Sequence, residues 1–308
     1  MNNPLVSVII PNYNHARFLD ERIQSVLNQT YQNFEVIILD DKSTDNSVEV
    51  INKYKDNPHV SHVVVNEENS GSTFKQWHKG FELAKGEVVW IAESDDSCDF
   101  TLLETLVVGY IENNAVLAFC RSCICDIEGN KSVYKHQSNL LGDFSMSGRD
   151  FISQYMIQLN AVANASSAIF DRKVAMSIDK QYMSMRGEGD WLFWIELMER
   201  GNVFFCTQEL NFFRFHQINT TNLLAVKGIG DIEHKKIFDY IVYRNLIKDS
   251  EIKNERLRYL NAVLHSRIYE TTQIKKEVLR VWDKFRFYRI YMYASCIKDE
   301  TLFFLRNL

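Results

Sequence analysis

Four short apolar runs in the first hundred residues alternate with segments of helical periodicity, and this alternation constrains the fold more than any other feature. The runs lie at 6–10, 34–41, 62–65 and 87–92, and each is rich in Val and Ile. Between them, apolar residues recur three or four positions apart, as on one face of a helix. Short apolar strands joined by helices form parallel sheets with both faces covered. We therefore predict an α/β fold with a mainly parallel, Rossmann-like central sheet flanked by helices.

The pattern changes along the chain, and this change predicts how the domains are divided. From Leu223 onward glycine and proline become rare and helical spacing dominates. We predict an α/β domain at 1–222 and a C-terminal helical region at 223–308. Within the first domain we expect a nucleotide-binding half at 1–97 and an acceptor-binding half at 98–222.

Charge and hydropathy exclude several classes of protein. The net charge is −5, and the acidic excess lies before residue 223, which disfavours a nucleic-acid surface. No run approaches the roughly 18 apolar residues that a membrane-spanning helix needs. The N-terminal segment has neither the basic residues nor the cleavage site of a secretory signal. We expect a cytoplasmic protein, either free or peripheral on the inner face of the membrane.

Three of the six cysteines lie close together, at Cys120, Cys123 and Cys125. Their spacing lacks the second ligand pair of a zinc site, and the surrounding alternation predicts a strand. We expect buried or half-buried thiols in a reducing compartment.

Polar residues follow each of the four predicted strands, at 11–14, 40–41, 66–71 and 93–96. The C-terminal ends of parallel strands meet at one edge of a sheet, and ligands of such folds bind there. The edge is therefore the predicted binding site.

The run ESDD at 93–96 has the strongest chemical character on this edge. Three carboxylates in four residues repel one another unless a cation or solvent compensates. Mg²⁺ and Mn²⁺ bind through one or two carboxylates plus substrate phosphates. The alternative is a solvated acidic turn before a helix capped by Thr101 and Glu104.

Asp40 and Asp41 follow the second strand and are a weaker signal. A carboxylate there can accept a hydrogen bond from a nucleotide base or a ribose hydroxyl. The alternative is that they cap the next helix together with Ser43 and Asp45, a role that suits Asp41 better than Asp40.

These segments together resemble the family 2 glycosyltransferases of GT-A fold, which are mostly inverting enzymes with nucleotide-sugar donors. The matching segments are VSVIIPNYNHARFLDERIQSVLNQTYQNFEVIILDDKSTD, the NSG at 69–71 and AKGEVVWIAESDD. They are dense and in order over the first hundred residues, and the resemblance continues in pieces to about residue 222.

The resemblance implies roles for the residues on the edge. Pro11, Tyr13, Asp40, Asp41, Asn69 and Glu93 fall where the family holds the donor nucleotide. Asp95 falls on the metal-binding position of the family's DxD motif, and Asp96 belongs to the same shell. Glu93 replaces the usual first Asp of this motif.

One departure from the family lies in the helix after the NSG loop. The family often has an Arg-Asn pair there, and this chain has Trp77-His78. Lys75 or Lys79 either substitutes for the missing donor contact or faces solvent.

The segment GEGDWLFWIELMERG at 187–201 resembles the family's ED-W segment, whose Asp is the general base. Asp190 matches that Asp, and Gly189 replaces the preceding Glu. Glu188, displaced by one position, is the reserve base. The alternative is that Asp190 only caps its helix.

Two further residues lie in FRFHQINTT. The family often has a His in a similar context near the diphosphate, so His216 is a candidate metal ligand. Arg214 is a candidate donor-binding residue that pairs with phosphate.

A basic aromatic stretch at 275–293 places Val278, Val281, Trp282, Phe285, Tyr288 and Met292 on one helical face. This face either packs on the catalytic domain, forms a homodimer or lies on an anionic membrane.

The expected activity is transfer of a sugar, with UDP as the default nucleotide and Mg²⁺ or Mn²⁺ as cofactor. The acceptor is a glycan or a lipid-linked acceptor in surface polysaccharide synthesis. Two alternatives stay open: a nucleotidyltransferase that makes nucleotide sugars, although the loop PNYNHARF lacks its glycines, and a non-catalytic nucleotide- or glycan-binding protein.

Overall fold

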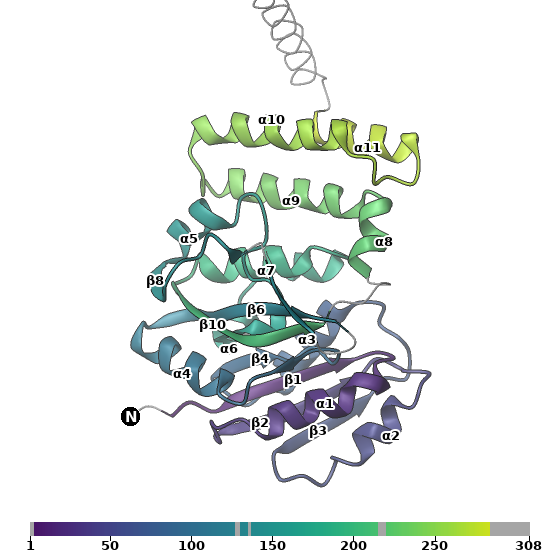
Figure 1. Cartoon of the computed structure of the whole chain (residues 1–308), viewed down its shortest axis with the longest axis vertical. Helices are drawn as coiled ribbons and strands as arrows, with labels where there is room; N and C mark the ends of the chain where they lie inside the picture. The colour runs from purple at the N-terminus through teal and green to yellow at the C-terminus, as the bar shows by residue number, and fades with distance from the viewer. Residues whose placement is uncertain (1–2, 127–129, 135–136, 215–219, 284–308) are drawn as a thin grey trace, which may run out of the picture. The chain divides into compact units, whose positions relative to one another are not determined.

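The computed structural model describes residues 3–126, 130–134, 137–214 and 220–283 (Figure 1). The chain divides into two compact units. The α/β unit comprises Met1–Ser184 and Gly189–Gln217, and the helical unit comprises Met185–Glu188 and Ile218–Leu308.

The α/β unit begins with the four strands that the sequence predicted. They are β1 (Val6–Asn12), β2 (Phe34–Asp40), β3 (Val60–Val65) and β4 (Val88–Ile91). β1 pairs in parallel with both β2 and β4, and β2 pairs in parallel with β3. Every residue of β1, β2 and β4 is buried, as expected for strands covered on both faces.

The remaining strands make the sheet mixed. In the described chain ten strands join in one sheet, with the path β3-β2-β1-β4-β9-β6-β10-β5. β9 (Ala168–Asp171) lies antiparallel between β4 and β6 (Ala115–Cys125), and β6 pairs in parallel with β10 (Asn202–Arg214). β5 (Ser97–Cys98), β7 (Lys131–Val133) and β8 (Phe144–Ser147) add short antiparallel edges. The predicted α/β class with a mainly parallel sheet is confirmed.

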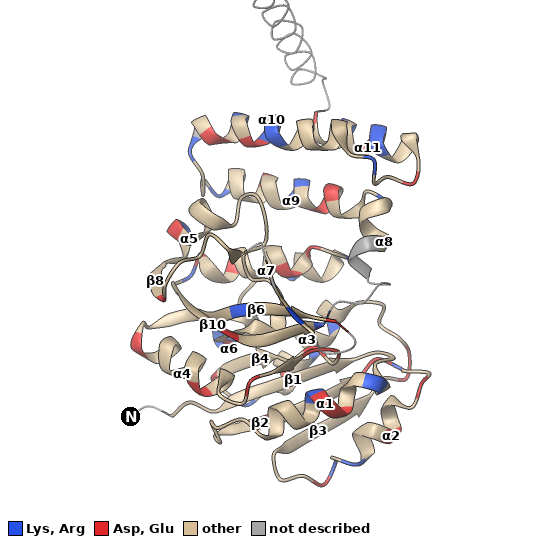
Figure 2. Ribbon diagram, in the orientation of Figure 1, with Lys and Arg blue, Asp and Glu red and all other residues tan. Residues whose placement is uncertain are grey.

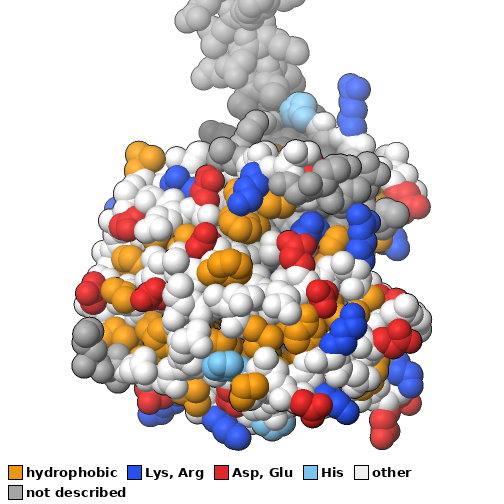
Figure 3. Space-filling model, turned by 60° about the horizontal axis from the view of Figure 1, so that its bottom comes forward, with side chains coloured by type: hydrophobic (Ala, Val, Ile, Leu, Met, Phe, Trp, Pro, Cys, Tyr) orange, Lys and Arg blue, Asp and Glu red, His pale blue; other side chains and the backbone are white. Residues whose placement is uncertain are grey.

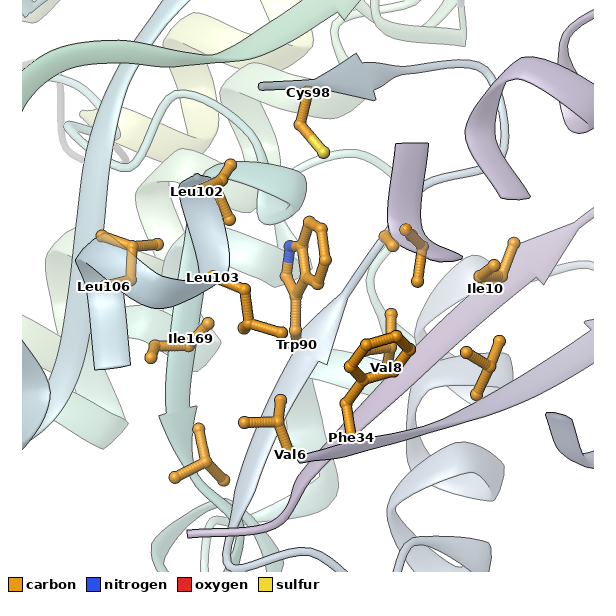
Figure 4. Close-up of a cluster of buried hydrophobic side chains, with 14 of the residues drawn as sticks. Val6, Val8, Ile10, Phe34, Trp90, Cys98, Leu102, Leu103, Leu106 and Ile169 are labelled. Carbon is orange, nitrogen blue, oxygen red and sulfur yellow. The ribbon is translucent and has the colours of Figure 1, made fainter. Parts of the chain in front are cut away.

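Helices cover one face of this sheet with aliphatic side chains. α1 (Ala16–Leu27), α2 (Ser47–Asn52) and α4 (Leu102–Glu112) lie on this face. Their apolar stripes pack on alternate residues of the strands, and Figure 4 shows part of this core around Trp90. The labelled side chains are Val6, Val8, Ile10, Phe34, Trp90, Cys98, Leu102, Leu103, Leu106 and Ile169.

The opposite face carries an aromatic core built from α3 (Thr73–Leu83), α7 (Gly189–Met198) and β9. Phe81 contacts Phe170 and Phe193 at ring-centroid distances of 5.7 and 5.8 Å. α3 approaches β1 so closely that a Cβ at Gly80 would lie 2.5 Å from Ile9 Cγ2. This close approach requires glycine at position 80.

Shorter elements complete the α/β unit. They are α5 (Gly148–Tyr155), α6 (Arg172–Met176) and the 3₁₀ helices at Ala165–Ser167 and Lys180–Ser184.

Two local predictions were wrong. Thr101 does not form a capping box with Glu104, because its Oγ1 donates to Asp99 Oδ1 and Glu104 Oε2 instead accepts from Thr30 Oγ1. Strand β1 does not end with the apolar run at 6–10 but continues through Pro11 to Asn12, which pairs with Asp40.

The clustered thiols Cys120, Cys123 and Cys125 are free and buried, as predicted, and so are the other two described cysteines, Cys98 and Cys206. Burial raises the pKa of the Cys123 thiol to about 11, so it stays protonated at neutral pH.

The helical unit contains α8 (Thr220–Val226), α9 (Ile229–Tyr243), α10 (Asp249–His265) and α11 (Thr272–Trp282). Trp282 stacks on Tyr259 at 3.9 Å, and its Nε1 donates to the carbonyl of Asp231. Of the face predicted for the C-terminal helix, Val278 and Trp282 are buried and Val281 is 37% exposed. Phe285, Tyr288 and Met292 lie outside the described residues.

Residues of both charge signs occur along α9, α10 and α11 (Figure 2). On the face shown in Figure 3, acidic and basic side chains are likewise interspersed. Among the described residues, no helix combines the length and apolarity needed to cross a lipid bilayer.

Candidate active site at the carboxyl end of strand β4

The acidic turn at 93–96 connects β4 to β5 and is held by its backbone. The N–H of Glu93 donates to Ser166 Oγ at 3.0 Å, and its carbonyl accepts from Arg22 Nε at 2.9 Å. The N–H of Asp96 closes the turn onto the Glu93 carbonyl at 3.2 Å. The turn therefore has a defined conformation at the strand end where the sequence placed the site.

Asp96 is buried and anchors the turn to the neighbouring strands. Its Oδ2 accepts from Asn164 Nδ2 at 2.6 Å and Ser166 Oγ at 2.7 Å, and its Oδ1 accepts from the backbone N–H of Arg214 at 3.0 Å. Both carboxylate oxygens are thus bonded to protein groups. These bonds fix the turn, and the metal-ligand role of Asp96 stays a prediction.

Asp95 is the half-buried carboxylate of the turn, with a side chain that is 23% exposed. Its carbonyl accepts from Arg214 Nε at 2.8 Å, and its Oδ1 lies 4.0 Å from His15 Nδ1. His15 Nδ1 also lies 2.9 Å from Ser94 Oγ. Sequence analysis missed His15, and its position just after β1, on the polar edge, was the signal that could have found it.

Glu93 extends away from the turn toward α3. Its Oε1 accepts from Trp77 Nε1 at 2.8 Å and lies 3.5 Å from Thr73 Oγ1. Trp77 of α3 therefore contacts the acidic turn.

The three carboxylates of the turn disfavour one another's ionisation. Burial and then the charge of Asp95 raise the pKa of Glu93 to about 8 and that of Asp96 to about 6. A bound cation would offset this cost, because it stabilises the ionised carboxylates. The donor set therefore suits a hard divalent cation.

The described residues do not by themselves supply a complete coordination shell. Within the described residues, no group of three His, Cys, Asp or Glu side chains could hold a metal ion. A site with one carboxylate ligand is completed by substrate phosphates and water in the usual Mg²⁺ arrangement. His216, the other predicted ligand, lies outside the described residues.

Asp40 is buried and binds protein groups at the ends of β1 and β2. Its carboxylate accepts from Asn12 Nδ2 at 2.7 Å and from the backbone N–H and Oγ of Ser43 at 2.9 and 2.6 Å.

Asp41 is also buried and organises the loop after β3. It accepts from Asn66 Nδ2, from the N–H and Oγ of Ser70, and from Gln76 Nε2, at 2.7 to 2.9 Å. Asn69 Nδ2 donates to the Asp41 carbonyl at 3.0 Å. The two aspartates thus shape the loops around the predicted nucleotide site.

The two lysines of α3 reach the same loop. Lys75 Nζ donates to the Ser70 carbonyl at 3.1 Å, and Lys79 Nζ donates to Asn66 Oδ1 at 2.5 Å.

Tyr13, after β1, is 46% exposed, whereas Pro11 is buried inside the strand. Tyr13 therefore presents a ring surface at this edge.

Arg214 joins β10 to the acidic turn. Besides its bond to the Asp95 carbonyl, its Nη2 donates to Glu21 Oε2 at 2.7 Å, and the guanidinium lies 4.8 Å from the Phe18 ring centroid. The side chain is only 7% exposed. These contacts show that Arg214 holds the turn, and its phosphate contact stays a prediction.

Asp190 lies in the first turn of α7 and is half-buried. Its Oδ2 accepts from Asn160 Nδ2 at 2.8 Å, which fixes the orientation of the carboxylate. A Cβ at Gly189 would lie 2.5 Å from the Tyr182 carbonyl and 2.6 Å from Phe74 Cε2. The Glu that the family has before its base therefore does not fit at position 189.

Glu188 belongs to the helical unit. Its backbone N–H donates to Glu233 Oε2 at 2.9 Å. The reserve base and Asp190 thus lie in different units, although only one residue separates them in sequence.

Comparisons with known proteins agree with this architecture. A family model described as Glycosyl transferase family 2 matches residues 7–178. An uncharacterized glycosyltransferase of Haemophilus influenzae is 37% identical over 131 residues, which are 42% of this chain and 52% of that protein. A Bacillus subtilis protein named as a teichuronic acid biosynthesis glycosyltransferase is 28% identical over 201 residues, which are 64% of this chain and 73% of that protein.

The match to the Haemophilus protein thus spans about half of that relative's length. Two solved structures share the fold. S. aureus TarS in complex with UDP-GlcNAc has a TM-score of 0.63 at 17% identity, covering 91% of this chain and 73% of that chain. A mannosyltransferase from Pyrobaculum calidifontis in complex with GDP-Man and Mn²⁺ has a TM-score of 0.57 at 15% identity, covering 94% of this chain and 84% of that chain.

Proposed function

Because this chain belongs to glycosyl transferase family 2, we propose that it transfers a hexose from a UDP-sugar to a hydroxyl of a glycan or lipid-linked acceptor, with inversion at the anomeric carbon. The observation that carries this proposal is the acidic turn at the carboxyl end of β4, where three carboxylates gather beside the loops of β1 and β2. The TarS and mannosyltransferase structures hold nucleotide sugars, which supports a donor of this class.

Asp95 is the residue that would hold a divalent cation, Mg²⁺ or Mn²⁺, together with the diphosphate of the donor. The raised pKa values of its neighbours favour a cation at this turn. Such an ion would offset the charge that develops on the nucleoside diphosphate as it leaves. Asp96 and Arg214 keep the Asp95 backbone in place from the opposite side.

The nucleotide binds along the ends of β1, β2 and β3. The exposed ring of Tyr13 offers a surface for the base. Asp40 and Asp41 shape the loops around it, and Glu93 contacts the ribose through its longer side chain.

Asp190 is the general base. Asn160 fixes one of its oxygens at 2.8 Å, so the carboxylate is oriented before the acceptor binds. As the acceptor oxygen bonds to the anomeric carbon, its proton passes to Asp190. The bond from that carbon to the diphosphate oxygen breaks on the opposite face, which inverts the configuration.

The relatives favour a surface-polymer acceptor. One is named for teichuronic acid biosynthesis, and another is named poly(ribitol-phosphate) beta-glucosyltransferase, from Bacillus spizizenii. We propose an acceptor of this class and a cytoplasmic location, with the enzyme either free or on the inner face of the membrane.

The test is a panel of nucleotide sugars with Mn²⁺ or Mg²⁺, measured as donor binding by calorimetry and as release of free nucleotide. We expect a UDP-sugar to bind only in the presence of the metal and to be turned over or slowly hydrolysed. Asp95→Ala should weaken metal-dependent binding at least about 10-fold, because it removes the protein's carboxylate ligand. Asp56→Ala, which removes an exposed carboxylate elsewhere in the α/β unit, is the matched control.

Two outcomes would contradict the proposal. Tight donor binding without any turnover would favour a non-catalytic binding protein. Synthesis of a nucleotide sugar from a sugar phosphate and a nucleoside triphosphate would identify a nucleotidyltransferase.

A further inference from the structure

The indole of Trp77 makes a polar contact that has no role in the proposed sugar transfer itself. Its Nε1 donates to Glu93 Oε1 at 2.8 Å, while the residue is 2% exposed. Thr73, one helical turn earlier on α3, lies 3.5 Å from the same oxygen. Among the described residues, the hydrogen bonds that the Glu93 side chain accepts all reach Oε1 and none reaches Oε2. The carboxylate is therefore anchored through Oε1.

The ring of Trp77 is itself fixed by packing. It contacts Phe74 at 5.2 Å, Phe193 at 5.8 Å and Trp194 at 6.1 Å between ring centroids. Phe193 and Trp194 belong to α7, the helix that carries Asp190 in its first turn. One buried side chain therefore joins the acidic turn to the helix that carries the base.

The length of Glu93 matches this arrangement. The backbone of Glu93 is held on two sides, by Ser166 Oγ and by Arg22 Nε. A shorter Asp at this position would withdraw the carboxylate by about 1.5 Å, one C–C bond length. Because the backbone is fixed, it cannot follow, and the 2.8 Å hydrogen bond would be lost.

We propose that Trp77 and Glu93 form a matched pair in which Trp77 positions the Glu93 carboxylate for the ribose of the donor. The inference rests on the proposed function, since it requires a nucleotide-sugar donor. It explains two departures from the family together. The indole of Trp77 replaces the Arg-Asn pair usual on this helix, and Glu93, one methylene longer than the usual Asp, reaches that indole. Trp77 is a positioning residue, because it acts on the donor through Glu93.

The first test compares two tryptophans of the same aromatic core. Trp77→Phe keeps a buried ring and removes the N–H donor. Trp194→Phe removes an indole that is fully buried and whose Nε1 has no hydrogen-bond partner among the described residues. We expect Trp77→Phe to raise the Kd and KM for the UDP-sugar about 10-fold with little change in kcat, as for loss of one buried hydrogen bond. Trp194→Phe should change both less than about 2-fold.

The second test uses Glu93→Asp, which restores the residue usual in the family and leaves the aromatic core intact. In the wild-type background it should weaken donor binding about 10-fold. In the Trp77→Phe background it should add less than about 2-fold, because the bond that it would break is already absent. This variant also tests the pair if Trp77→Phe does not fold.

Equal effects of Trp77→Phe and Trp194→Phe would overturn the inference, since packing alone would then explain them. Independent, multiplicative losses from Glu93→Asp and Trp77→Phe would overturn it as well. Both results leave the proposed function standing. A wild-type protein that binds no nucleotide sugar would instead overturn the proposed function and the pair together.

Discussion

The side chain of Asp190 has a more defined environment than a helix-capping residue requires. Its Oδ2 accepts from the amide of Asn160, which lies thirty positions away in sequence. Gly189, the residue before Asp190, has no Cβ, so its backbone packs closely against Tyr182 and Phe74. These contacts hold a half-buried carboxylate at the start of α7, as a general base needs.

Asp190→Asn tests this role directly. The amide keeps the shape of the side chain but cannot accept the proton of the acceptor hydroxyl. We expect turnover with saturating donor and acceptor to fall by about 10²- to 10⁴-fold. Donor affinity, measured by calorimetry with Mn²⁺, should stay within about 2-fold of the wild type. An unchanged rate would remove Asp190 as the base.

At the scale of elements, helix α9 holds the segment that precedes α7 in the chain. Glu233 is 4% exposed, and its carboxylate accepts three successive backbone N–H groups. Arg186 donates to Oε1 at 2.7 Å, and Gly187 and Glu188 donate to Oε2 at 2.9 Å each. Consecutive N–H groups around one carboxylate form the kind of nest that binds anions. A side chain of α9 thus fixes the backbone of residues 186–188.

Glu233→Gln should loosen this segment. The amide group has one acceptor oxygen in place of two and lacks the negative charge that strengthens the bonds. We expect hydrogen exchange at the backbone amides of residues 186–188 to accelerate about 10-fold, because local opening becomes easier.

Asp239→Asn is the control, since it alters an exposed ion pair with Lys235 on the same helix, and such pairs contribute little. Equal exchange rates in both variants would contradict a clamp by Glu233.

At the scale of the whole molecule, stability should depend on a carboxyl group inside the α/β unit. Glu196, on α7, is 2% exposed, and its Oε1 has no hydrogen-bond partner among the described residues. Burial raises the pKa of Glu196 to about 7, although the N–H of Asp179 and the charge of Arg200 lower it. The folded protein therefore holds this proton up to a higher pH than the unfolded chain does.

The sign of the pH dependence follows from that difference. The contribution of the protonated Glu196 side chain to the free energy of unfolding is fully present below about pH 4.5 and is lost as the pH rises through about 7. Glu196→Gln removes the ionisation. We expect the free energy of unfolding of the variant to exceed that of the wild type by roughly 1–3 kcal/mol at pH 8. At pH 5 the two free energies should be nearly equal.

Urea unfolding at the two pH values, followed by the fluorescence of the buried tryptophans, measures this difference. A gap between variant and wild type that stays constant with pH would contradict the assignment.

Sequence patterns predicted the elements that local spacing defines. The buried strands predicted at 6–10, 34–41 and 87–92 are present in the structure as β1, β2 and β4. Their signals are local, since apolar periodicity and strand length decide them. The insertion of β9 between β4 and β6 could not be predicted, because it depends on pairing between residues far apart in the chain.

The residue types at the site could likewise be predicted from the sequence, but their hydrogen-bond partners could not. By itself the sequence determined that acidic and polar groups follow the strands, because side-chain chemistry and the ends of apolar runs are local properties of the chain. Only the tertiary structure decided that Asp96 and Arg214 anchor the turn while Glu93 reaches Trp77, because hydrogen bonds between distant segments depend on how the helices pack on the sheet.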